Sequence, residues 1–456
     1  MKLKVILAIL LCRALRLVSR MLHRGGTAMP GRYAMKICPQ LLSVLAKDVK
    51  VVAITGTNGK TTCARMIEEA FAKQGKRYFS NRSGANLIDG ITTEFVINSS
   101  LSGKCRCDYA VIECDEAASV KVFRQMQPAV IVVTNLFRDQ LDRFGTLSNT
   151  RESIKAAILS TPGAILCLNA DCSITSSLAL EVPNEARFFG IDKGAAPNRE
   201  KSDISDGTLC IRCGHEYEFD YINYGHLGGF RCPVCGHARP AADFAVVDIA
   251  DQSTEGSTLV MNMQGEKRMV TVNLPAMYNI YNAAAAAAAV TAMGLSADAA
   301  VEALAGFKCG FGRMEQFDLG AGVRMMLVKN PTGCNLVMEF LRNIKEKFSL
   351  VISLNDRTGD GKDISWIWDT DFEELCALSG RLQRVVVAGD RAEEMLLRLK
   401  YAGLDEKSIE LERDCDKLVD WIEKQQEPVF IMPTYSAMMD MRAALVRRCG
   451  GSDFWE

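Results

Sequence analysis

The segment from Lys50 to Gly75 constrains the fold of this chain most, because a strand, a glycine-rich turn and a helix follow one another there. KVVAIT is an apolar, β-branched run typical of a buried strand, and CARMIEEAFAKQG is helical in character and ends in glycine. Backbone N–H groups of such a turn, and of the helix after it, bind anions. The order of elements therefore predicts a nucleotide-phosphate site in the turn GTNGKTT, which consists of Gly56, Thr57, Asn58, Gly59, Lys60, Thr61 and Thr62.

Two side chains of this turn suit the phosphates and their counterion. In a phosphate-binding loop the lysine reaches the outer phosphates and the next hydroxyl holds Mg²⁺, which assigns these roles to Lys60 and Thr61. The match to the general motif is imperfect, since Ile54 stands where the motif has its first glycine. The alternative is a glycine-rich turn with a chance lysine.

Three further apolar runs lie at residues 109–113, 129–134 and 164–169, with helix-like stretches between them. This alternation predicts a parallel sheet covered by helices on both faces. Ligands of such sheets bind beyond the carboxyl ends of the strands, where Glu113 and Asn135 stand. A carboxylate opposite a phosphate loop can hold Mg²⁺ or a bound water, so Glu113 is a candidate ligand. The alternative is a buried carboxylate paired with Lys or Arg.

Two Cys-x2-Cys pairs, separated by eighteen residues, consist of Cys210, Cys213, Cys232 and Cys235. Two such knuckles complete a tetrahedral Zn²⁺ site, and because four protein ligands leave no open position, we expect the zinc to be structural. His215, His226 and His237 are competing ligands. A nucleic-acid-binding ribbon is the alternative, but the stretch has no dense Lys/Arg patch and the net charge of the chain is -1.

Residues 1–47 are basic and apolar. They begin like a secretory signal, but the apolar run is short, four arginines interrupt the residues after it, and no clear cleavage site appears. The segment is also too short and too charged to span a bilayer. An amphipathic helix fits better, either packed on the body of the protein or resting on a membrane surface. The odd, scattered set of 17 cysteines favours a reducing compartment, so we expect a cytoplasmic protein with peripheral contact to the inner membrane face as an option.

From about residue 313 the α/β pattern starts again. VRMMLV, SLVISL, RVVVAG and PVFIMP read as strands with helix-like stretches between them, which predicts a second sheet. Carboxylates are dense in the loop after SLVISL, and such a group binds a metal, does acid–base work or faces water. This loop contains Asp356, Asp360, Asp363, Asp369 and Asp371, together with Trp366 and Trp368.

Four motifs resemble the Mur ligases when taken in order: GTNGKTT, TNLFRDQLDRFG (134–145), YNIYNAAAA (278–286) and GRME (312–315). The resemblance covers roughly residues 45–315. The four cysteines and DGKDISWIWD (360–369) are similar to the MurT family, the synthetase subunits of lipid II isoglutaminyl synthase. The resemblance implies an N-terminal segment at 1–47, a Mur ligase-like P-loop domain at 48–312 with a zinc ribbon at about 206–240, and a Rossmann-like α/β domain at 313–456.

The resemblance also implies site roles. Lys60 and Thr61 would bind the phosphates of ATP and Mg²⁺, with Glu113 helping to hold the metal. Asn279 would contact the nucleotide, and Arg313 would lie near ATP at the domain junction. The sequence departs from the family at two places: DQLD (139–142) replaces the common DHLD, and Tyr278 replaces a histidine. The alternative for residues 278–294 is a plain alanine-rich core helix.

The activity implied is ATP-dependent amidation of the D-glutamate α-carboxylate of the lipid II stem peptide, through an acyl phosphate attacked by ammonia. An amino-acid-adding Mur ligase and a non-catalytic nucleotide- and zinc-binding scaffold are the alternatives. The four histidines lie at positions 23, 215, 226 and 237, far in sequence from the C-terminal motifs. The chain is therefore expected to lack a Cys–His glutaminase of its own, and the resemblance supplies one as a partner, a GatD-like class I glutaminase.

A partner with Cys and His needs a carboxylate to orient its imidazole, and the resemblance implies that this chain supplies it. We favour Asp360, because a turn between two glycines can project its carboxylate outward, with Asp363 as the second candidate. Trp366 and Trp368 would then anchor the interface. The alternative is an aspartate-rich loop that caps a helix, with both tryptophans buried.

Overall fold

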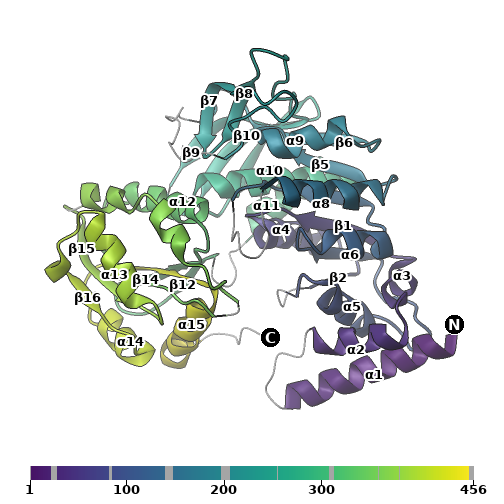
Figure 1. The fold of residues 1–456 in the computed structure, drawn as a ribbon, viewed down its shortest axis with the longest axis horizontal. Coiled ribbons are helices and arrows are strands. Elements are labelled where there is room, and N and C mark those ends of the chain that lie inside the picture. The colour runs from purple at the N-terminus through teal and green to yellow at the C-terminus, as the bar shows by residue number, and fades with distance from the viewer. Residues whose placement is uncertain are drawn as a thin grey trace.

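The chain was analysed as a computed structural model, which describes residues 2–21, 28–81, 85–138, 147–196, 206–253, 255–307, 313–357, 359–378 and 380–450 (Figure 1). Two sheets organise it. The larger has nine strands in the order β11-β10-β9-β6-β5-β4-β1-β3-β2, and the smaller has six in the order β12-β13-β17-β14-β15-β16.

The nine-stranded sheet is parallel from β2 to β9, and β9, β10 and β11 are antiparallel. The strands predicted from the sequence are confirmed as β1, β3, β4 and β5. The bounds are β1 (Lys50–Thr55), β2 (Tyr78–Ser80), β3 (Tyr109–Glu113), β4 (Val130–Val133), β5 (Ile165–Asn169), β6 (Ala186–Ile191), β9 (Phe244–Gln252), β10 (Ser257–Met263) and β11 (Glu266–Val272).

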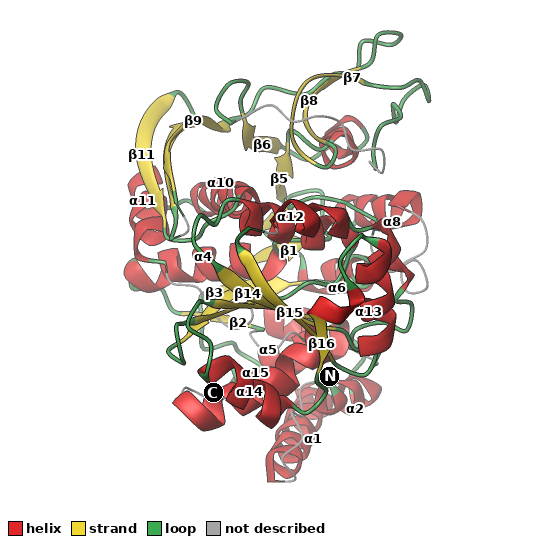
Figure 2. Cartoon of the chain, turned by 90° about the vertical axis from the view of Figure 1, so that its left-hand side faces the viewer, coloured by secondary structure: helices red, strands yellow, loops and turns green. Residues whose placement is uncertain are grey.

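Helices cover both faces of this sheet, as predicted (Figures 1 and 2). On one face α4 (Lys60–Lys73), α10 (Met277–Ala292) and α11 (Ala297–Gly306) pack against one another, and on the other α6 (Ser119–Met126) packs against α8 (Leu147–Leu159). Short helices α9 (Ser173–Ser176) and η1 (Ser177–Leu180) follow β5. Strand β1 lies between β3 and β4 and is fully buried after its first residue, which places the phosphate loop at the middle of the carboxyl edge.

The N-terminal segment forms three helices, α1 (Lys2–Met21), α2 (Met29–Ile37) and α3 (Leu41–Ala46). Helix α1 packs on α2 and on α5 (Ile88–Ile97) and forms the lower edge of the molecule in Figure 1. Among the helices that the structure describes, none combines the length and apolarity needed to cross a bilayer.

A separate hairpin of β7 (Glu218–Tyr224) and β8 (Leu227–Arg231) stands between β6 and β9 in the sequence. Since β6 and β9 are parallel neighbours in the large sheet, the segment that carries the hairpin is also the connection between them. The hairpin forms the top of the molecule in Figure 1, at the opposite end of the central domain from α1.

The six-stranded sheet confirms the four strands predicted after residue 313. It contains β12 (Arg313–Phe317), β13 (Val323–Met326), β14 (Phe348–Ser353), β15 (Leu382–Ala388), β16 (Ile409–Leu411) and β17 (Val429–Pro433). Only β12 is antiparallel to its neighbour. The helical elements are α12 (Pro331–Arg342), η2 (Ser365–Asp369), η3 (Phe372–Leu378), α13 (Ala392–Tyr401), η4 (Glu406–Ser408), α14 (Cys415–Glu423) and α15 (Tyr435–Cys449). The divisions at residues 47/48 and 312/313 stay predictions.

Candidate nucleotide and metal sites

The predicted phosphate loop connects β1 to α4 and depends on two glycines with positive φ. Gly56 has φ +120° and Gly59, which precedes the first turn of α4, has φ +90°. A Cβ on Gly59 would lie 2.1 Å from Oδ1 of Asn282. Both positions therefore require glycine, because side chains rarely adopt this conformation and no space is left for one.

The loop is held in place by the segment after β4. The N–H of Thr57 donates to the carbonyl oxygen of Asn135 at 2.8 Å, and the N–H of Asn58 donates to Oδ1 of Asn135 at 3.0 Å. The hydroxyl of Thr134 donates to the carbonyl oxygen of Asn58 at 2.7 Å. Asn135 was expected at a strand end near the ligand, and the structure shows that it supports the loop backbone. The DQLD motif (139–142) lies outside the described residues.

Lys60 and Thr61 both face carboxylates at the carboxyl end of β3, with Glu113 as its last residue and Glu116 just after it. Nζ of Lys60 lies 2.8 Å from Oε1 of Glu116, an ion pair that is nearly buried, and it also donates to the carbonyl oxygen of Gly56. The hydroxyl of Thr61 donates to Oε2 of Glu113 at 2.9 Å. The structure thus brings together the three residues predicted for phosphate and metal. Glu116 was not singled out, although it stands three residues after Glu113.

Two features of the loop suit a nucleotide and its metal. Nδ2 of Asn58 is buried and has no hydrogen-bond partner among the described residues, so it is a free donor at the phosphate loop. The hydroxyl of Thr61 and the carboxylate of Glu113 are hard oxygen ligands of the kind that Mg²⁺ takes. Thr62 is buried in the first turn of α4, and its place at the nucleotide stays a prediction.

The two asparagines in the first turns of α10, Asn279 and Asn282, make different contacts. Asn279 is buried, and its Nδ2 donates to the carbonyl oxygen of Pro275 at 2.6 Å. Asn282, one turn further on, lies against Gly59 and donates to Oδ1 of Asn279 at 3.3 Å. The predicted contact of Asn279 with the nucleotide stays a prediction, and in this structure Asn282 is the asparagine that lies against the phosphate loop.

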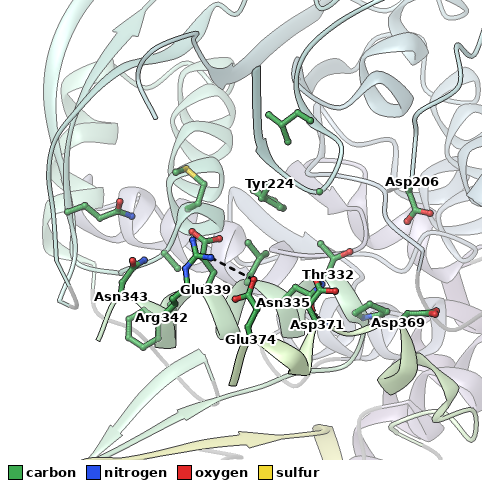
Figure 3. A pocket seen from close by; sticks show the side chains of 18 of the residues that line it. Asp206, Tyr224, Thr332, Asn335, Glu339, Arg342, Asn343, Asp369, Asp371 and Glu374 are labelled. Carbon is green, nitrogen blue, oxygen red and sulfur yellow. Dashed lines mark hydrogen bonds and ion pairs between the residues drawn. The ribbon is translucent and has the colours of Figure 1, made fainter. Parts of the chain in front are cut away.

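The C-terminal domain reaches the phosphate loop through Asn330. Its Nδ2 donates to Oδ1 of Asn58 at 3.2 Å, and its own Oδ1 accepts the N–H of Gly333 to cap α12. A cleft of about 1060 Å³ opens beside this contact, between the hairpin strand β7 and α12 (Figure 3). Arg313 starts β12, and its side chain lies outside the described part of the structure.

The aspartates of the C-terminal loop separate into two groups. Asp369 and Asp371 line the cleft, and Asp371 exchanges two hydrogen bonds with Asn335 of α12 (Figure 3). Asp356, in contrast, pairs with Arg391 at 2.7 Å. Asp363 is half-buried and accepts the N–H of Ser365 at 2.8 Å. Hydrogen bonds from Ser365 hold the pKa of the Asp363 carboxyl below its usual value.

Asp360 does not project outward as expected, and that reason for choosing it was wrong. Its carboxylate is only 6% exposed and turns toward the start of α15. Oδ1 accepts the N–H of Ser436 at 2.7 Å, Oδ2 accepts the Ser436 hydroxyl, and Oδ2 also accepts the N–H of Arg357 at 3.1 Å. The carboxylate is thus fixed at a helix N-terminus, as the alternative interpretation of a capping loop had it.

The two tryptophans differ from each other. Trp366 is half-buried against the core of the C-terminal domain. Trp368 is 48% exposed, with the ring of Tyr401 edge-on at 5.7 Å and the guanidinium of Arg398 at 5.5 Å from its centre. The alternative in which both tryptophans are buried is therefore wrong for Trp368.

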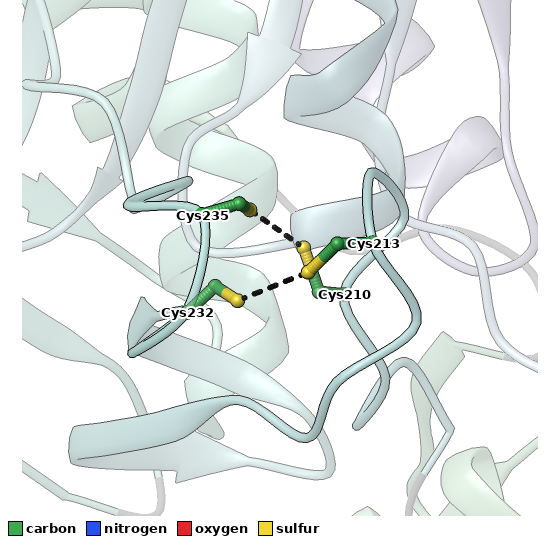
Figure 4. A group of neighbouring side chains, drawn as sticks. All are labelled: Cys210, Cys213, Cys232 and Cys235. Atoms are coloured by element: carbon green, nitrogen blue, oxygen red, sulfur yellow. Dashed lines mark hydrogen bonds between the residues drawn. The ribbon is translucent and has the colours of Figure 1, made fainter.

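The four cysteines predicted to bind zinc lie together, with their sulfur atoms all within 4.8 Å of one another (Figure 4). Zinc–sulfur bonds of about 2.3 Å in a tetrahedron require sulfur separations near ~3.8 Å, so the residues fit the ion. The two knuckles have the same backbone design. In each, a cysteine N–H donates to the carbonyl oxygen of a histidine, and the turn ends in a glycine with positive φ, Gly214 or Gly236.

The three histidines near this cluster, which were competing ligands in the sequence, are not part of it. His237 bonds through Nδ1 to the hydroxyl of Tyr217 at 2.7 Å, and the side chain of His215 is exposed. His226 lies 3.2 Å from the sulfur of Cys172, and both are buried. The described residues thus contain a Cys–His pair that the sequence did not single out, but both of its side chains are buried, so it offers no accessible nucleophile.

A buried polar network joins the β7–β8 hairpin to α10. The carboxylate of Asp171, which is fully buried, accepts hydrogen bonds from Nε of Arg239 at 2.7 Å and from the hydroxyl of Tyr281. Asn223 of β7 in turn donates to the Tyr281 oxygen at 2.8 Å. Burial raises the pKa of Asp171, although Arg239 and Tyr281 act against that rise. The network holds α10 through Tyr281. The next residue of α10 is Asn282, which lies against Gly59 of the phosphate loop.

Comparison with solved structures defines the class of protein. The fold matches MurF from Acinetobacter baumannii with a TM-score of 0.67 at 15% identity, covering 91% of this chain and 81% of that chain. It matches a MurF ligase from Thermotoga maritima in complex with ADP with a TM-score of 0.62 at 16% identity, covering 92% and 85%. The model of the Mur ligase middle domain matches residues 54–228. The fold and the phosphate loop are those of a Mur ligase.

Two sequence relatives narrow the class. One from Streptococcus pneumoniae is 32% identical over 98% of both chains, and one from Staphylococcus aureus strain COL is 33% identical over 97% of this chain and 98% of that one. Both are named lipid II isoglutaminyl synthase (glutamine-hydrolyzing) subunit MurT. The model of the MurT ligase C-terminal region matches residues 327–438. The chain belongs to the MurT family, which confirms the resemblance inferred from its motifs.

Proposed function

We propose that this chain is the ATP-dependent synthetase subunit of a lipid II isoglutaminyl synthase. It amidates the α-carboxylate of D-glutamate in the lipid II stem peptide and so produces D-isoglutamine for peptidoglycan. Identity of 32% across 98% of both chains with a relative of that name carries the proposal. The contacts of Lys60, Thr61 and Glu113 support it, because they are those that a phosphate-transferring site needs.

The reaction runs in two steps. A carboxylate oxygen attacks the terminal phosphorus of ATP, which forms an acyl phosphate and releases ADP. The nitrogen of ammonia then attacks the carbonyl carbon, phosphate leaves, and the nitrogen loses a proton to give the amide. Lys60 stabilises the charge on the transferred phosphoryl group once the nucleotide displaces it from Glu116, and the loop N–H groups hold the inner phosphates.

We assign ATP and Mg²⁺ to the loop and Zn²⁺ to the four cysteines. Thr61 and Glu113 would hold Mg²⁺, which neutralises phosphate charge when bound. Cys210, Cys213, Cys232 and Cys235 leave no open position on zinc, so the ion is structural. Burial acts to raise the pKa of Cys210, but hydrogen bonds from Tyr217 and two backbone N–H groups lower it below its usual value, whereas the pKa of Cys213 in the same cluster is raised.

Ammonia comes from a partner subunit in this proposal, a GatD-like class I glutaminase. The Cys172–His226 pair is too deeply buried to hydrolyse glutamine, and the relatives are named as subunits of a glutamine-hydrolysing synthase. We propose Asp360 as the carboxylate that orients the partner's histidine, since hydrogen bonds from Ser436 and Arg357 fix it as a triad acid must be fixed. Asp363 is the second candidate, and Trp368 offers an exposed anchor for the partner.

We place the reaction in the cytoplasm, at the inner face of the membrane. The described cysteines are all free thiols, which suits a reducing compartment. A lipid-linked substrate also requires the enzyme to work beside a bilayer.

The test is amidation by the purified complex. The chain and its glutaminase are incubated with ATP, Mg²⁺ and lipid II, with either glutamine or ammonium chloride, and the product is analysed by mass spectrometry. The expected result is conversion of one carboxylic acid to a primary amide with both nitrogen sources. Attachment of an added amino acid instead would identify an amino-acid-adding Mur ligase. A folded, zinc-loaded complex with no ammonia-dependent ATP hydrolysis would leave only the scaffold.

A further inference from the structure

Helix α1 has two apolar faces, and only one of them is used in the fold. Val5, Ala8, Ile9 and Cys12 are buried against α2 and α5. A second set of apolar side chains on the same helix is exposed to 46–73%, namely Leu3, Leu7, Leu10, Leu17, Val18 and Met21. At about 100° per residue these side chains share one arc, opposite the buried set. Exposed leucines repeated along a whole helix are unusual on a free surface.

The charged residues of α1 that flank this arc are all positive, and Glu94 of α5 lies near enough to Arg20 to interact with it. Lys2 and Arg20 stand on one side of it and Lys4 on the other, and all three are exposed. The first 47 residues contain nine Lys and Arg and no Asp or Glu, whereas the other 45 Lys and Arg share the rest of the chain with all 55 acidic residues. The segment that contains α1 therefore has a formal charge of +9, whereas the rest of the chain has one of −10 (45 basic minus 55 acidic residues).

This sign of charge decides between two occupants of the exposed face. The spacing of Leu3, Leu7, Leu10, Leu17 and Met21 also suits a coiled coil with a second copy. Such pairing, however, places like charges along both edges of the interface, and a helix of 20 residues is short for it. An anionic lipid surface satisfies both features, because acyl chains accept the leucines and headgroups accept the lysines and arginines.

We propose that α1 docks this protein on an anionic bilayer, lying in the plane of the interface with Leu3, Leu7, Leu10 and Leu17 among the lipid acyl chains. Since α1 forms one outer edge of the molecule and the zinc hairpin the opposite end of the central domain, the hairpin points away from the bilayer (Figure 1). This inference deepens the proposed function, because docking holds the enzyme where a lipid-linked substrate is presented.

The experiment is vesicle sedimentation of the complex with its glutaminase. The vesicles contain phosphatidylcholine either alone or with one-third phosphatidylglycerol. Leu3→Gln/Leu7→Gln/Leu17→Gln removes the apolar arc, and Lys4→Glu/Arg20→Glu reverses its flanking charge. The matched control, Leu159→Gln/Leu180→Gln/Leu209→Gln, makes the same change at exposed leucines elsewhere. None of these side chains is buried, so the fold should persist, as circular dichroism and zinc content will show.

We expect partitioning onto anionic vesicles to fall about tenfold in the leucine variant and in the charge variant, and to stay unchanged in the control. Binding of the wild type should weaken in high salt, since screening shortens the reach of the charges. Equal binding to both vesicle types, no binding by the wild type, or a dimer that the leucine variant dissociates would each overturn the proposal.

Activity measured separately keeps this proposal distinct from the proposed function. A water-soluble, short-chain analogue of the substrate should be amidated equally by the wild type and the leucine variant. Loss of activity on that analogue in the variant would show that α1 serves the fold and would contradict the docking role. Vesicle binding without any amidation by the wild type would reject the proposed function and leave the docking role standing.

Discussion

The phosphate loop of the central domain and the aspartate loop of the C-terminal domain occupy equivalent places, yet they hold their polar groups in opposite ways. Each follows a buried parallel strand, β1 or β14, at the carboxyl edge of a sheet. In the phosphate loop, neighbouring segments hold the backbone and leave Nδ2 of Asn58 without a partner among the described residues. In the aspartate loop, the carboxylates of Asp356, Asp360 and Asp363 already have donors within the chain.

This difference is the basis for proposing separate roles for the two loops. We propose that the phosphate loop, which has an unused donor in Nδ2 of Asn58 among the described residues, binds a small anion. In the aspartate loop the carboxylates already accept hydrogen bonds within the chain, and we propose that one of them, held in this orientation, contacts a group of another protein. Four variants test this contrast, beginning with the change expected to have the largest effect.

Asp360→Asn should lower glutamine-dependent amidation by about 10³- to 10⁴-fold, as expected for a triad acid that can no longer hold the imidazole in the right tautomer. Ammonia-dependent amidation should stay unchanged, because the phosphate loop is intact. Both rates are measured on the complex, with Asp363→Asn and Ser436→Ala as matched variants. Full glutamine-dependent activity in both aspartate variants would make the loop purely structural.

Lys60→Met should lower amidation with either nitrogen source by about 10²- to 10³-fold, since one preorganised charge on the transferred phosphoryl group is lost. Glutamine hydrolysis by the partner should persist. Lys362→Met, at an exposed lysine of the aspartate loop, is the matched control. If it reduced ammonia-dependent turnover as much as Lys60→Met, the two loops would not have separate tasks.

Gly59→Ala should weaken ATP binding by about tenfold, equivalent to ~1.4 kcal/mol. The new methyl group collides with Asn282 and forces a positive φ on alanine, so the loop must shift. Gly75→Ala is the control, because Gly75 also has positive φ but has nothing within 4 Å of a Cβ. Calorimetric titration with a non-hydrolysable ATP analogue measures both. Equal loss in the two variants would attribute the effect to backbone strain alone.

Tyr281→Phe should lower the free energy of unfolding by about 1.5–3 kcal/mol, because the buried Asp171 carboxylate loses a hydrogen-bond donor. ATP affinity should fall only a few-fold, since Asn282 is disturbed indirectly. Tyr221→Phe removes a neutral hydrogen bond to the carbonyl oxygen of Ile191 in the same region, and about 0.5–1.5 kcal/mol is expected for it. Urea denaturation compares the two. No difference between them would show that the network does not support α10.

The sequence predicted the geometry of the phosphate loop and the cluster of four cysteines because their residues are close together in the chain. Strand, glycine turn and lysine specify one geometry, and two Cys-x2-Cys knuckles need only to meet. Glu116 is only three residues from the predicted Glu113, but its pairing with Lys60 depends on the position of the loop after β3, which the sequence does not reveal. The contact of Asn330 with Asn58 could not be predicted from the sequence, because it joins residues from different domains.

The contacts of the aspartate loop were harder to predict from the sequence, for a physical reason. Two flanking glycines reveal that the backbone at Asp360 is permissive, but they do not reveal where its hydrogen-bond donors lie. Two of those donors belong to Ser436, at the start of α15, and they draw the carboxylate inward. Composition therefore indicated that carboxylates gather here, while tertiary contacts alone decide which of them faces the cleft, which caps a helix and which pairs with arginine.

The placement of the four-cysteine segment limits how this protein can be shortened. Strands β6 and β9 run in the same direction, with Ile191 beside Val246, so the chain must return about 7 Å along the strand direction before β9 can begin. In most parallel sheets a helix makes this return, whereas here the segment with the four cysteines does. A truncation that joins residue 191 directly to 244 would reverse or lose the edge of the sheet, and with it β10 and β11. A minimal synthetase designed from this chain has to replace the four-cysteine segment with another bridge.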